Sequence, residues 1–207
     1  MCSSDLGSDV VGTIRNVLVT DCAIRDSHRG VSVRVNLAGT IERAVFANLV
    51  IETRLYDPAW WGRATPIDVV VTPWNEVTTP GHVRDIVFSN ILCRGENGVV
   101  VYGHDMGLVE RITFENVDVT IDKTTAYEGG RQDLRPAPGD AFPLMPSAGF
   151  LLRRAHGVIL HGCSVRWGEH RPEYYQSALD SEGCAGLEVR DFAGQSDRKS
   201  TRLNSSH

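Results

Sequence analysis

Apolar and polar positions follow one recurring pattern of eleven residues along this chain. In VRDIVFSNILC (83–93), apolar residues hold the first, fourth, sixth, ninth and eleventh places, and Asn90 holds the eighth. A helix would place apolar residues at i, i+3, i+4 and i+7, and a single strand would alternate strictly. The pattern fits neither, so it predicts two short strands separated by a bend at Asn90.

Five further segments carry the same pattern and therefore the same predicted bend. Clear copies begin at Ile14, Ile41 and Val109, and weaker copies begin at Ala155 and Cys184. These copies share an asparagine, an aspartate or a glycine at the eighth place: Asp21, Asn48, Asn90, Asn116, Gly162 and Asp191. Such residues tolerate the left-handed backbone conformation that a sharp bend needs. We interpret this column as a structural ladder of bend residues.

The spacing of the copies predicts a solenoid. Successive copies start 27, 42, 26, 46 and 29 residues apart, which indicates a basic coil of under 30 residues with two insertions. Another strand-like run lies between the copies each time, at 30–35, 66–71, 98–103, 149–153 and 177–181. Three short strands per coil, stacked in parallel and without helical periodicity, predict an all-β fold, the right-handed parallel β-helix.

Both ends of the chain break this pattern. The tail DRKSTRLNSSH (197–207) is the in-frame translation of a common sequencing-library adapter, and MCSSDL (1–6) translates the matching adapter end with GTG read as the start codon. We therefore predict adapter-derived residues at 1–6, a partial β-helix domain at 7–196, and adapter-derived residues at 197–207. On this interpretation the chain is an internal fragment, so the absence of a signal peptide carries no information.

Composition and charge argue against several classes of function. The chain is 42% hydrophobic and 23% charged, and it has no apolar run near the ~18 residues of a membrane helix, so no membrane span is predicted. A formal charge of −5 argues against nucleic-acid binding. The cysteines after residue 6 fall in apolar places of the repeat, which favours free core thiols over disulfides. No histidine or cysteine has metal-ligand spacing, so no metal site and no cofactor are predicted.

The order of the motifs resembles family-28 glycoside hydrolases, which include polygalacturonases and rhamnogalacturonases. GSDVVGTIRNVLVTDCAI (7–24), RGVSVRV (29–35) and IERAVFANLVIE (41–52) are similar to the segments that follow the catalytic centre in that family. WWGRATPIDVVV (60–71) is similar to one coil of its bacterial members. The resemblance covers residues 7–196 and implies the pectin-lyase-like β-helix fold.

The resemblance also implies an activity and a substrate clamp. Hydrolysis of a glycosidic bond normally uses two carboxyl groups that flank the bond. The family carries these aspartates and a Gly-His-Gly motif upstream of the segment that Gly7 begins, so we predict no catalytic residue in this chain and no hydrolysis by it alone. The family's Arg-x-Lys clamp for a sugar carboxylate aligns with residues 32–34, where Arg34 keeps a cation but Ser32 does not. A neutral or differently decorated pectic glycan therefore stands beside polygalacturonate as a candidate substrate.

Strand alternation predicts where such a glycan would lie. Ser32 and Arg34 should point outward from the run 30–35, and Asp68 and Tyr102 should point outward from the next two runs. Outward residues of successive coils stack about 4.8 Å apart and would form a strip for an extended oligosaccharide. Arg34 is the principal candidate for binding. Its alternative role is that of a surface arginine neutralised by a carboxylate such as Asp68.

Insertions between the strands would form walls beside this strip. The insertions at 54–66 and 72–81 contain Trp60, Trp61 and Trp74, which offer flat, partly polar surfaces for sugar stacking. A loop tryptophan can instead cap the small core of its own loop. The longer insertion at 122–146 is rich in Gly and Pro and is expected to fold over the helix surface.

Two functions from different classes remain open. The intact parent is either a hydrolase of pectin-like polysaccharide, secreted or periplasmic as the resemblance implies, or a non-catalytic β-helix scaffold such as a surface adhesin or a carbohydrate-binding protein. A lyase is a third, less favoured function, because the sequence has no cluster of calcium-binding carboxylates. In the first interpretation the partner is a pectic or related polysaccharide and the chain is a monomer.

Overall fold

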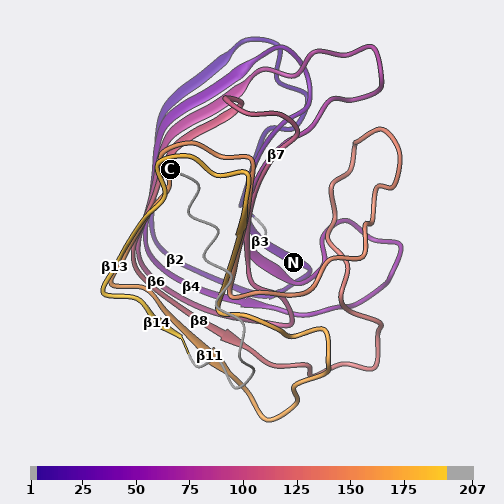
Figure 1. The fold of residues 1–207 in the computed structure, drawn as a ribbon, viewed down its shortest axis with the longest axis vertical. Coiled ribbons are helices and arrows are strands. Elements are labelled where there is room, and N and C mark those ends of the chain that lie inside the picture. Colours follow the sequence, from indigo (N-terminus) through magenta and orange to yellow (C-terminus); the bar gives the residue numbers. More distant parts are fainter. Residues whose placement is uncertain (1–3, 195–207) are drawn as a thin grey trace.

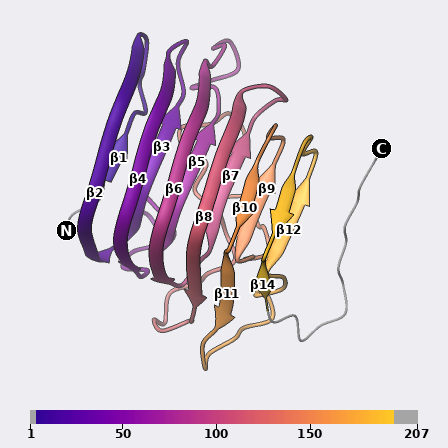
Figure 2. The same cartoon turned by 90° about the vertical axis from the view of Figure 1, so that its left-hand side faces the viewer.

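Residues 4–194 are described by a computed structural model, and within this range the chain is all-β without a helix. Its strands pair in parallel and form two sheets (Figures 1 and 2). The order of the first sheet is β1 (Ser4–Leu6), β3 (Arg29–Val35), β5 (Thr65–Val71), β7 (Val99–Gly103), β9 (Phe150–Arg153) and β12 (Leu179–Glu182).

The second sheet holds the bent segments that the sequence pattern predicts. Its order is β13 (Glu188–Arg190), β10 (Ile159–His161), β8 (Val109–Ile121), β6 (His82–Gly95), β4 (Thr40–Thr53) and β2 (Thr13–Ser27). Alongside this path, β11 (Ser164–Trp167) pairs with β8 and with β14 (Ala193–Gly194). The chain alternates between the two sheets, so each turn adds a neighbour to each sheet (Figure 2). This arrangement is consistent with a parallel β-helix.

The predicted bend at the eighth place of the repeat is confirmed in all six copies. Asn48, Asn90 and Asn116 have φ values of 56°, 55° and 53°, and each lies within one of the long strands β4, β6 and β8. In the last two coils the two arms are separate strands, with Gly162 between β10 and β11 and Asp191 between β13 and β14. The predicted three short strands per coil therefore occur as one bent and one straight strand in the earlier coils.

A second bend at the third place of the repeat was not predicted. The six residues at this place also have positive φ: Asn16, Arg43, Asp85, Arg111, Gly157 and Gly186. Two of these residues on adjacent coils pair, because Arg111 Nε donates to Asp85 Oδ1 at 2.6 Å and Nη2 donates to Oδ2 at 3.0 Å. Each bent segment thus turns twice, and side chains of neighbouring coils meet at the corner.

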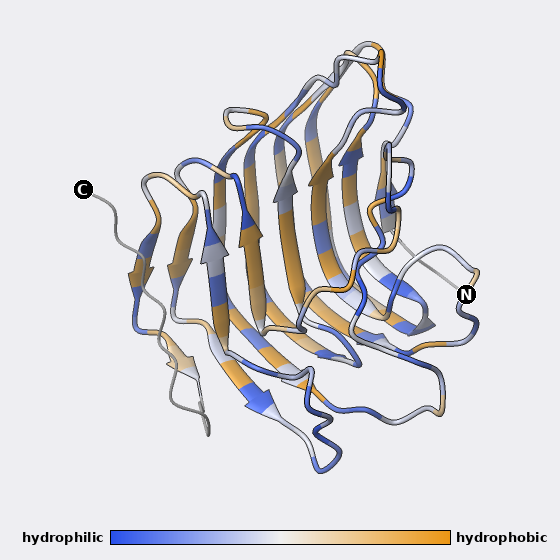
Figure 3. Cartoon of the chain, turned by 45° about the vertical axis from the view of Figure 1, so that its right-hand side comes forward, coloured by the Kyte–Doolittle hydropathy of each residue, from blue (hydrophilic) through white to orange (hydrophobic). Residues whose placement is uncertain are grey.

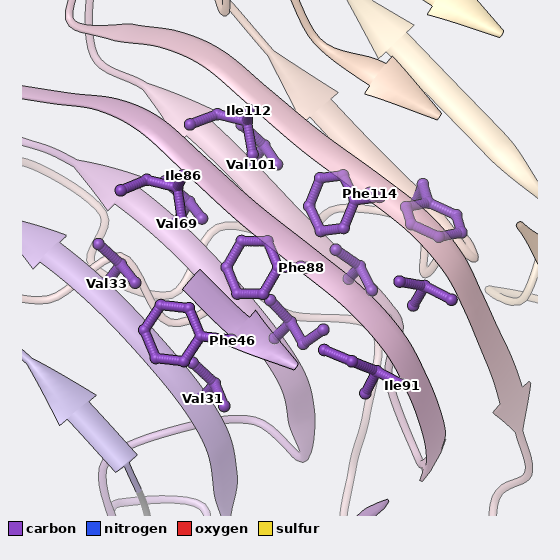
Figure 4. Packing of buried hydrophobic residues seen from close by; sticks show 14 of the residues in the cluster. Val31, Val33, Phe46, Val69, Ile86, Phe88, Ile91, Val101, Ile112 and Phe114 are labelled. Carbon is purple, nitrogen blue, oxygen red and sulfur yellow. The ribbon is translucent and has the colours of Figure 1, made fainter. Parts of the chain in front are cut away.

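The core lies between the two sheets and is filled by the inward residues of the strands from β2 to β11. Val31, Val33 and Val35 are fully buried there, as strand alternation predicts, and Figure 3 shows the alternation as hydrophobic and hydrophilic bands along the strands. Phe46, Phe88 and Phe114 hold the same place of the repeat and stack through the core (Figure 4). Their ring centroids are 5.2 and 5.0 Å apart, with interplanar angles of 13° and 10°.

The cysteines after residue 6 lie at different depths in the fold. Cys22, Cys93, Cys163 and Cys184 are free thiols as predicted, but only Cys93 and Cys163 are buried in the core. Burial raises the pKa of both of these thiols.

Residues 4–194 contain no helix of the length and apolarity that a membrane crossing needs.

Most of the two predicted adapter segments lies outside the described residues, which exclude 1–3 and 195–207. Residues 4–6 form β1, and this strand pairs in parallel with residues 31–33 of β3. Parallel pairing uses backbone hydrogen bonds that any sequence without proline can make. The origin of residues 1–6 therefore stays a prediction.

The insertion at 122–146 covers the outer face of the first sheet beside β3 and β5, as expected (Figure 1). It contacts the strands directly, because Arg34 Nη2 donates to the Asp133 carbonyl at 2.7 Å and Thr72 Oγ1 donates to the Pro136 carbonyl at 2.9 Å. Outward residues of the strands, such as Val70, are consequently buried. The strip predicted to be open along these strands is instead largely covered.

Candidate functional site

A pocket of about 410 Å³ remains open where the insertions meet the start of β3. Arginine, tryptophan, histidine and serine side chains dominate its lining: Ser27, His28, Arg29, Ser32, Arg34, Trp60, Trp61 and Arg135, together with residues 5–8. The strand β3 supplies its floor, the insertion at 54–66 supplies the tryptophans, and the insertion at 122–146 supplies Arg135. The pocket therefore brings together four of the seven residues predicted to bind a glycan.

Arg34 lies at the base of this pocket, and its guanidinium is held by protein groups. Its Nε donates to Asp68 Oδ2 at 2.7 Å and to Ser32 Oγ at 3.2 Å, and Nη2 lies 2.6 Å from the same carboxylate oxygen. The remaining Nη1 donates to the carbonyl of Arg135 at 2.9 Å. Arg34, Ser32 and Asp68 are all buried. Asp68 thus neutralises Arg34, which is the alternative role that the sequence left open for this arginine.

Asp133 is the second carboxylate of this cluster, and sequence analysis did not single it out. Its side chain is buried and accepts hydrogen bonds from Arg29 Nη2 at 3.1 Å and from the Gly62 backbone N–H at 2.6 Å. Burial by itself would raise the pKa of Asp133, but the hydrogen bond from Arg135, the charge of Arg34 and the Gly62 N–H lower this pKa to about 2. Asp133 is thus ionised at any pH near neutrality and cannot donate a proton.

Two further arginines give the cluster an excess of positive charge. Arg29 and Arg63 are both buried, with Arg29 Nε only 3.7 Å from Asp68 Oδ1. Burial lowers the pKa of Arg63, and the charge of Asp133 opposes that effect. Arg29, Arg34 and Arg135 pair with the carboxylates of Asp68 and Asp133. With Arg63 there are four cations, which outnumber these two anions even when Asp5 of the pocket lining is counted with them. A ligand with an anionic or strongly hydrogen-bond-accepting group suits such surroundings.

Trp60 and Trp61 form the outer wall of the pocket. Their residues are 57% and 49% exposed, so they do not cap a core of their own loop. The guanidinium of Arg135 lies over the Trp61 ring, with Cζ 4.4 Å from the centroid. Exposed indole rings at the rim of a polar pocket are surfaces on which the apolar face of a sugar ring can stack.

His28 is a pocket residue that the sequence did not mark as functional. It is 3% exposed, and its Nδ1 lies 2.8 Å from the carbonyl oxygen of Trp61. Because a carbonyl oxygen only accepts, Nδ1 carries the proton and Nε2 is the unprotonated nitrogen of a neutral ring. Burial is the main cause of the lowered pKa of His28, and the charge of Arg63 adds to it. No periodicity or motif could have indicated this residue, because its role depends on a loop more than thirty residues away.

Tyr102 and Trp74, the other two candidates, lie outside the pocket. The hydroxyl of Tyr102 accepts a hydrogen bond from Arg154 Nη2 at 2.5 Å, and its ring packs beside buried Val100. Trp74 is 45% exposed in the loop that follows β5, whereas Trp61 lies in the loop that precedes this strand. The structure therefore gathers Ser32, Arg34, Trp60 and Trp61 around the pocket and places Asp68 beneath them, bonded to Arg34.

In residues 4–194, no group of three or more histidine, cysteine, aspartate or glutamate side chains is placed to hold a metal ion. The comparisons with known proteins found no match for this chain among protein-family models, curated proteins or solved structures.

Proposed function

We propose that this chain is the C-terminal part of a glycoside hydrolase that acts on pectin-like polysaccharide, built on a right-handed parallel β-helix. The observation that carries the proposal is the pocket at β3, where two exposed tryptophans stand over a cluster of arginines. Tryptophan suits a sugar ring, and arginine suits the carboxylates and hydroxyls of pectic sugars. The parallel sheets and the motif order from Gly7 onward agree with this interpretation.

In this proposal the chain binds the glycan but does not cleave it. A hydrolase needs one carboxyl group that can donate a proton, usually with a raised pKa. Asp133, with its pKa of about 2, has the opposite property, and Asp68 is engaged by Arg34. The acid and the base would come from the upstream part of the parent protein, which would be secreted or periplasmic and monomeric.

A binding measurement with the full chain tests this function. Titration calorimetry with tetragalacturonate, a rhamnogalacturonan oligosaccharide and galactotetraose should give a dissociation constant for at least one of them. Trp60→Ala and Trp61→Ala should each weaken that binding about tenfold, because one aromatic contact contributes roughly 1.4 kcal/mol. Tyr127→Ala is the matched control, since Tyr127 is an exposed aromatic residue of the insertion that does not line the pocket.

Two outcomes would count against the proposal. Binding of none of the three probes would remove its basis, and release of reducing sugar by the purified chain would contradict the assignment of catalysis to the upstream part. The second candidate function, a non-catalytic β-helix scaffold, is favoured by the engagement of both carboxylates of the pocket cluster, Asp68 and Asp133, with arginines. It predicts binding without activity even in the intact parent.

A further inference from the structure

The insertion at 122–146 supplies Arg135 to the pocket, and its polar contacts reach both β3 and the loop of Trp60 and Trp61. Its residues Asp133 and Arg135 lie next to the loop of Trp60 and Trp61, although some seventy residues separate them in sequence. Three chain segments meet at this point: the start of β3, the tryptophan loop and the insertion. The contacts among them decide how the tryptophan wall is held.

The carboxylate of Asp133 accepts hydrogen bonds from all three segments. Its Oδ2 accepts from Arg29 Nη2 of β3 at 3.1 Å and from the backbone N–H of Gly62, next to Trp61, at 2.6 Å. Within the insertion, Oδ1 accepts from Arg135 Nε at 2.9 Å and Oδ2 accepts from Arg135 Nη2 at 3.0 Å. A carboxylate with this many charge-assisted hydrogen bonds has little freedom to move.

Arg135 completes the connection from the same carboxylate. Its Nη1 donates to the carbonyl of Ala59 at 3.1 Å, and its Nη2 donates to the carbonyl of Trp60 at 2.7 Å. The guanidinium also lies over two rings, with Cζ 4.4 Å from the centroid of Trp61 and 4.1 Å from that of Phe142. One residue thus fixes the backbone of the tryptophan loop and covers one face of Trp61.

We propose that Asp133 is a positioning residue, which acts through Arg135 and Gly62 to hold Trp60 and Trp61 as a rigid wall for a sugar ring. This inference rests on the proposed glycan-binding function. A loop ordered before the ligand arrives loses less conformational freedom on binding than a loose one, so the affinity is higher. The insertion is therefore part of the binding site, although its central residue need not touch the sugar.

Fluorine NMR of the chain labelled with 5-fluorotryptophan gives a readout that a general loss of stability would not imitate. Each tryptophan contributes its own line, and Trp→Phe variants assign the lines. In Asp133→Asn, the lines of Trp60 and Trp61 should shift and sharpen, while those of Trp74 and Trp167 should stay. The affinity for the oligosaccharide that binds the unaltered chain should fall about tenfold, because the wall is no longer ordered in advance.

The matched control and a second variant keep the test decisive. Asp140→Asn changes the same kind of side chain in the same insertion, but Asp140 is exposed and bonds only to the nearby Phe142 N–H in the described chain, so the four lines should stay. If Asp133→Asn does not fold, Arg135→Lys tests the connection between the insertion and the tryptophan loop. Lysine keeps the charge but cannot bridge the carbonyls of Ala59 and Trp60. Unchanged Trp60 and Trp61 lines in the folded variants would overturn this inference. If the unaltered chain binds no probe, the proposed function fails, while shifted lines still support the positioning of the loop by Asp133.

Discussion

Arginine is an unusual residue at a left-handed bend, yet Arg43 and Arg111 both take that conformation, with φ of 53° and 52°. The conformation costs an ordinary side chain about 1–2 kcal/mol. At Arg111 the paired hydrogen bonds to Asp85 on the preceding coil offset part of this cost. The hydrogen bond from Arg111 is also the main reason why the pKa of Asp85 is lowered. The corner of the coil is thus stabilised by contacts between coils.

Asn90 allows the cost of the other bend to be measured. Its Nδ2 donates to Asn48 Oδ1 at 3.3 Å, and its Oδ1 accepts from Asn116 Nδ2 at 3.2 Å, so it combines a left-handed backbone with a ladder of amides. Asn90→Val should lower the free energy of unfolding by about 2–3 kcal/mol, since it loses both features. Urea unfolding monitored by circular dichroism measures the change.

Asn90→Gly separates the two contributions. Glycine takes the left-handed conformation without strain, so this variant loses only the exposed side-chain hydrogen bonds and should cost about 1 kcal/mol or less. Gly162 already holds the equivalent place in the fifth copy, with φ of 64°. If Asn90→Val and Asn90→Gly lowered the free energy of unfolding equally, the left-handed bend would not be the source of the cost.

The bends at the eighth and third places of the repeat differ in how well the sequence predicts them. The eighth place was predictable because asparagine, aspartate and glycine recur there in every copy, and these residues have a known tolerance for positive φ. The third place was not predictable, because Arg43 and Arg111 are not left-handed formers by their own chemistry. Their conformation is imposed by the closure of the coil, which is a tertiary effect.

The stacked phenylalanines show how the elements hold each other. Phe46 of β4, Phe88 of β6 and Phe114 of β8 are all buried and nearly parallel, so Phe88 is packed on both faces (Figure 4). Phe88→Ala should lower the free energy of unfolding by about 3–5 kcal/mol, because it leaves a cavity between two rings. Thermal or urea unfolding would measure the loss.

Val87→Ala is the control for this prediction on the same strand. Val87 points away from the core and is only partly buried, so its truncation should cost about 1 kcal/mol or less. A loss at Phe88 no larger than that at Val87 would show that the ring stack does not stabilise the sheet. Phe88→Leu, which fills most of the volume, should recover part of the stability.

The sequence predicted the surroundings of the inward-facing side chains better than those of the outward-facing ones. Alternation correctly placed Val31, Val33 and Val35 in the core, because the two faces of a strand follow from backbone geometry alone. It could not show that Arg34 would be covered by the insertion. That insertion has no periodic pattern, and its contacts with β3 join residues about one hundred positions apart. The sequence therefore named four of the residues that surround the pocket, but it did not predict how the insertion would cover them.

Across the whole molecule, the insertion adds a connection that a simple stack of coils lacks. In a solenoid each coil contacts its immediate neighbours, so stability is nearly a sum of local terms. The insertion after β8 reaches back to β3, past the coils of β5 and β7, and bonds through Asp133 to Arg29 and through its backbone to Arg34. Unfolding of the coils near the pocket should consequently be coupled to the release of the insertion.

Acid should destabilise the folded chain in two stages. Both stages involve the junction at which the start of β3, the loop of Trp60 and Trp61, and the insertion at 122–146 meet. Burial holds the pKa of His28 below its ordinary 6.5, so the unfolded chain binds that proton first and the free energy of unfolding falls as the pH drops below about 6.5. Asp133 has a folded pKa of about 2 against its ordinary 3.8, so its contribution of about 2 kcal/mol is present above pH 4 and is lost as the pH falls towards 2.

Urea unfolding at pH 7.5, 5.5 and 3 resolves the two stages when variants are compared with the unaltered chain. His28→Gln can still donate to the Trp61 carbonyl but does not titrate, so it should reduce the loss between pH 7.5 and 5.5. Asp133→Asn should reduce the loss between pH 5.5 and 3, at the cost of lower stability near neutrality. The remaining described histidines are more exposed than His28, so an unchanged first stage in His28→Gln would place the acid sensitivity elsewhere than in this pocket. A reduced first stage would instead show that one buried imidazole, held between the tryptophan loop and a cluster of arginines, makes the junction respond to acid before its carboxylates do.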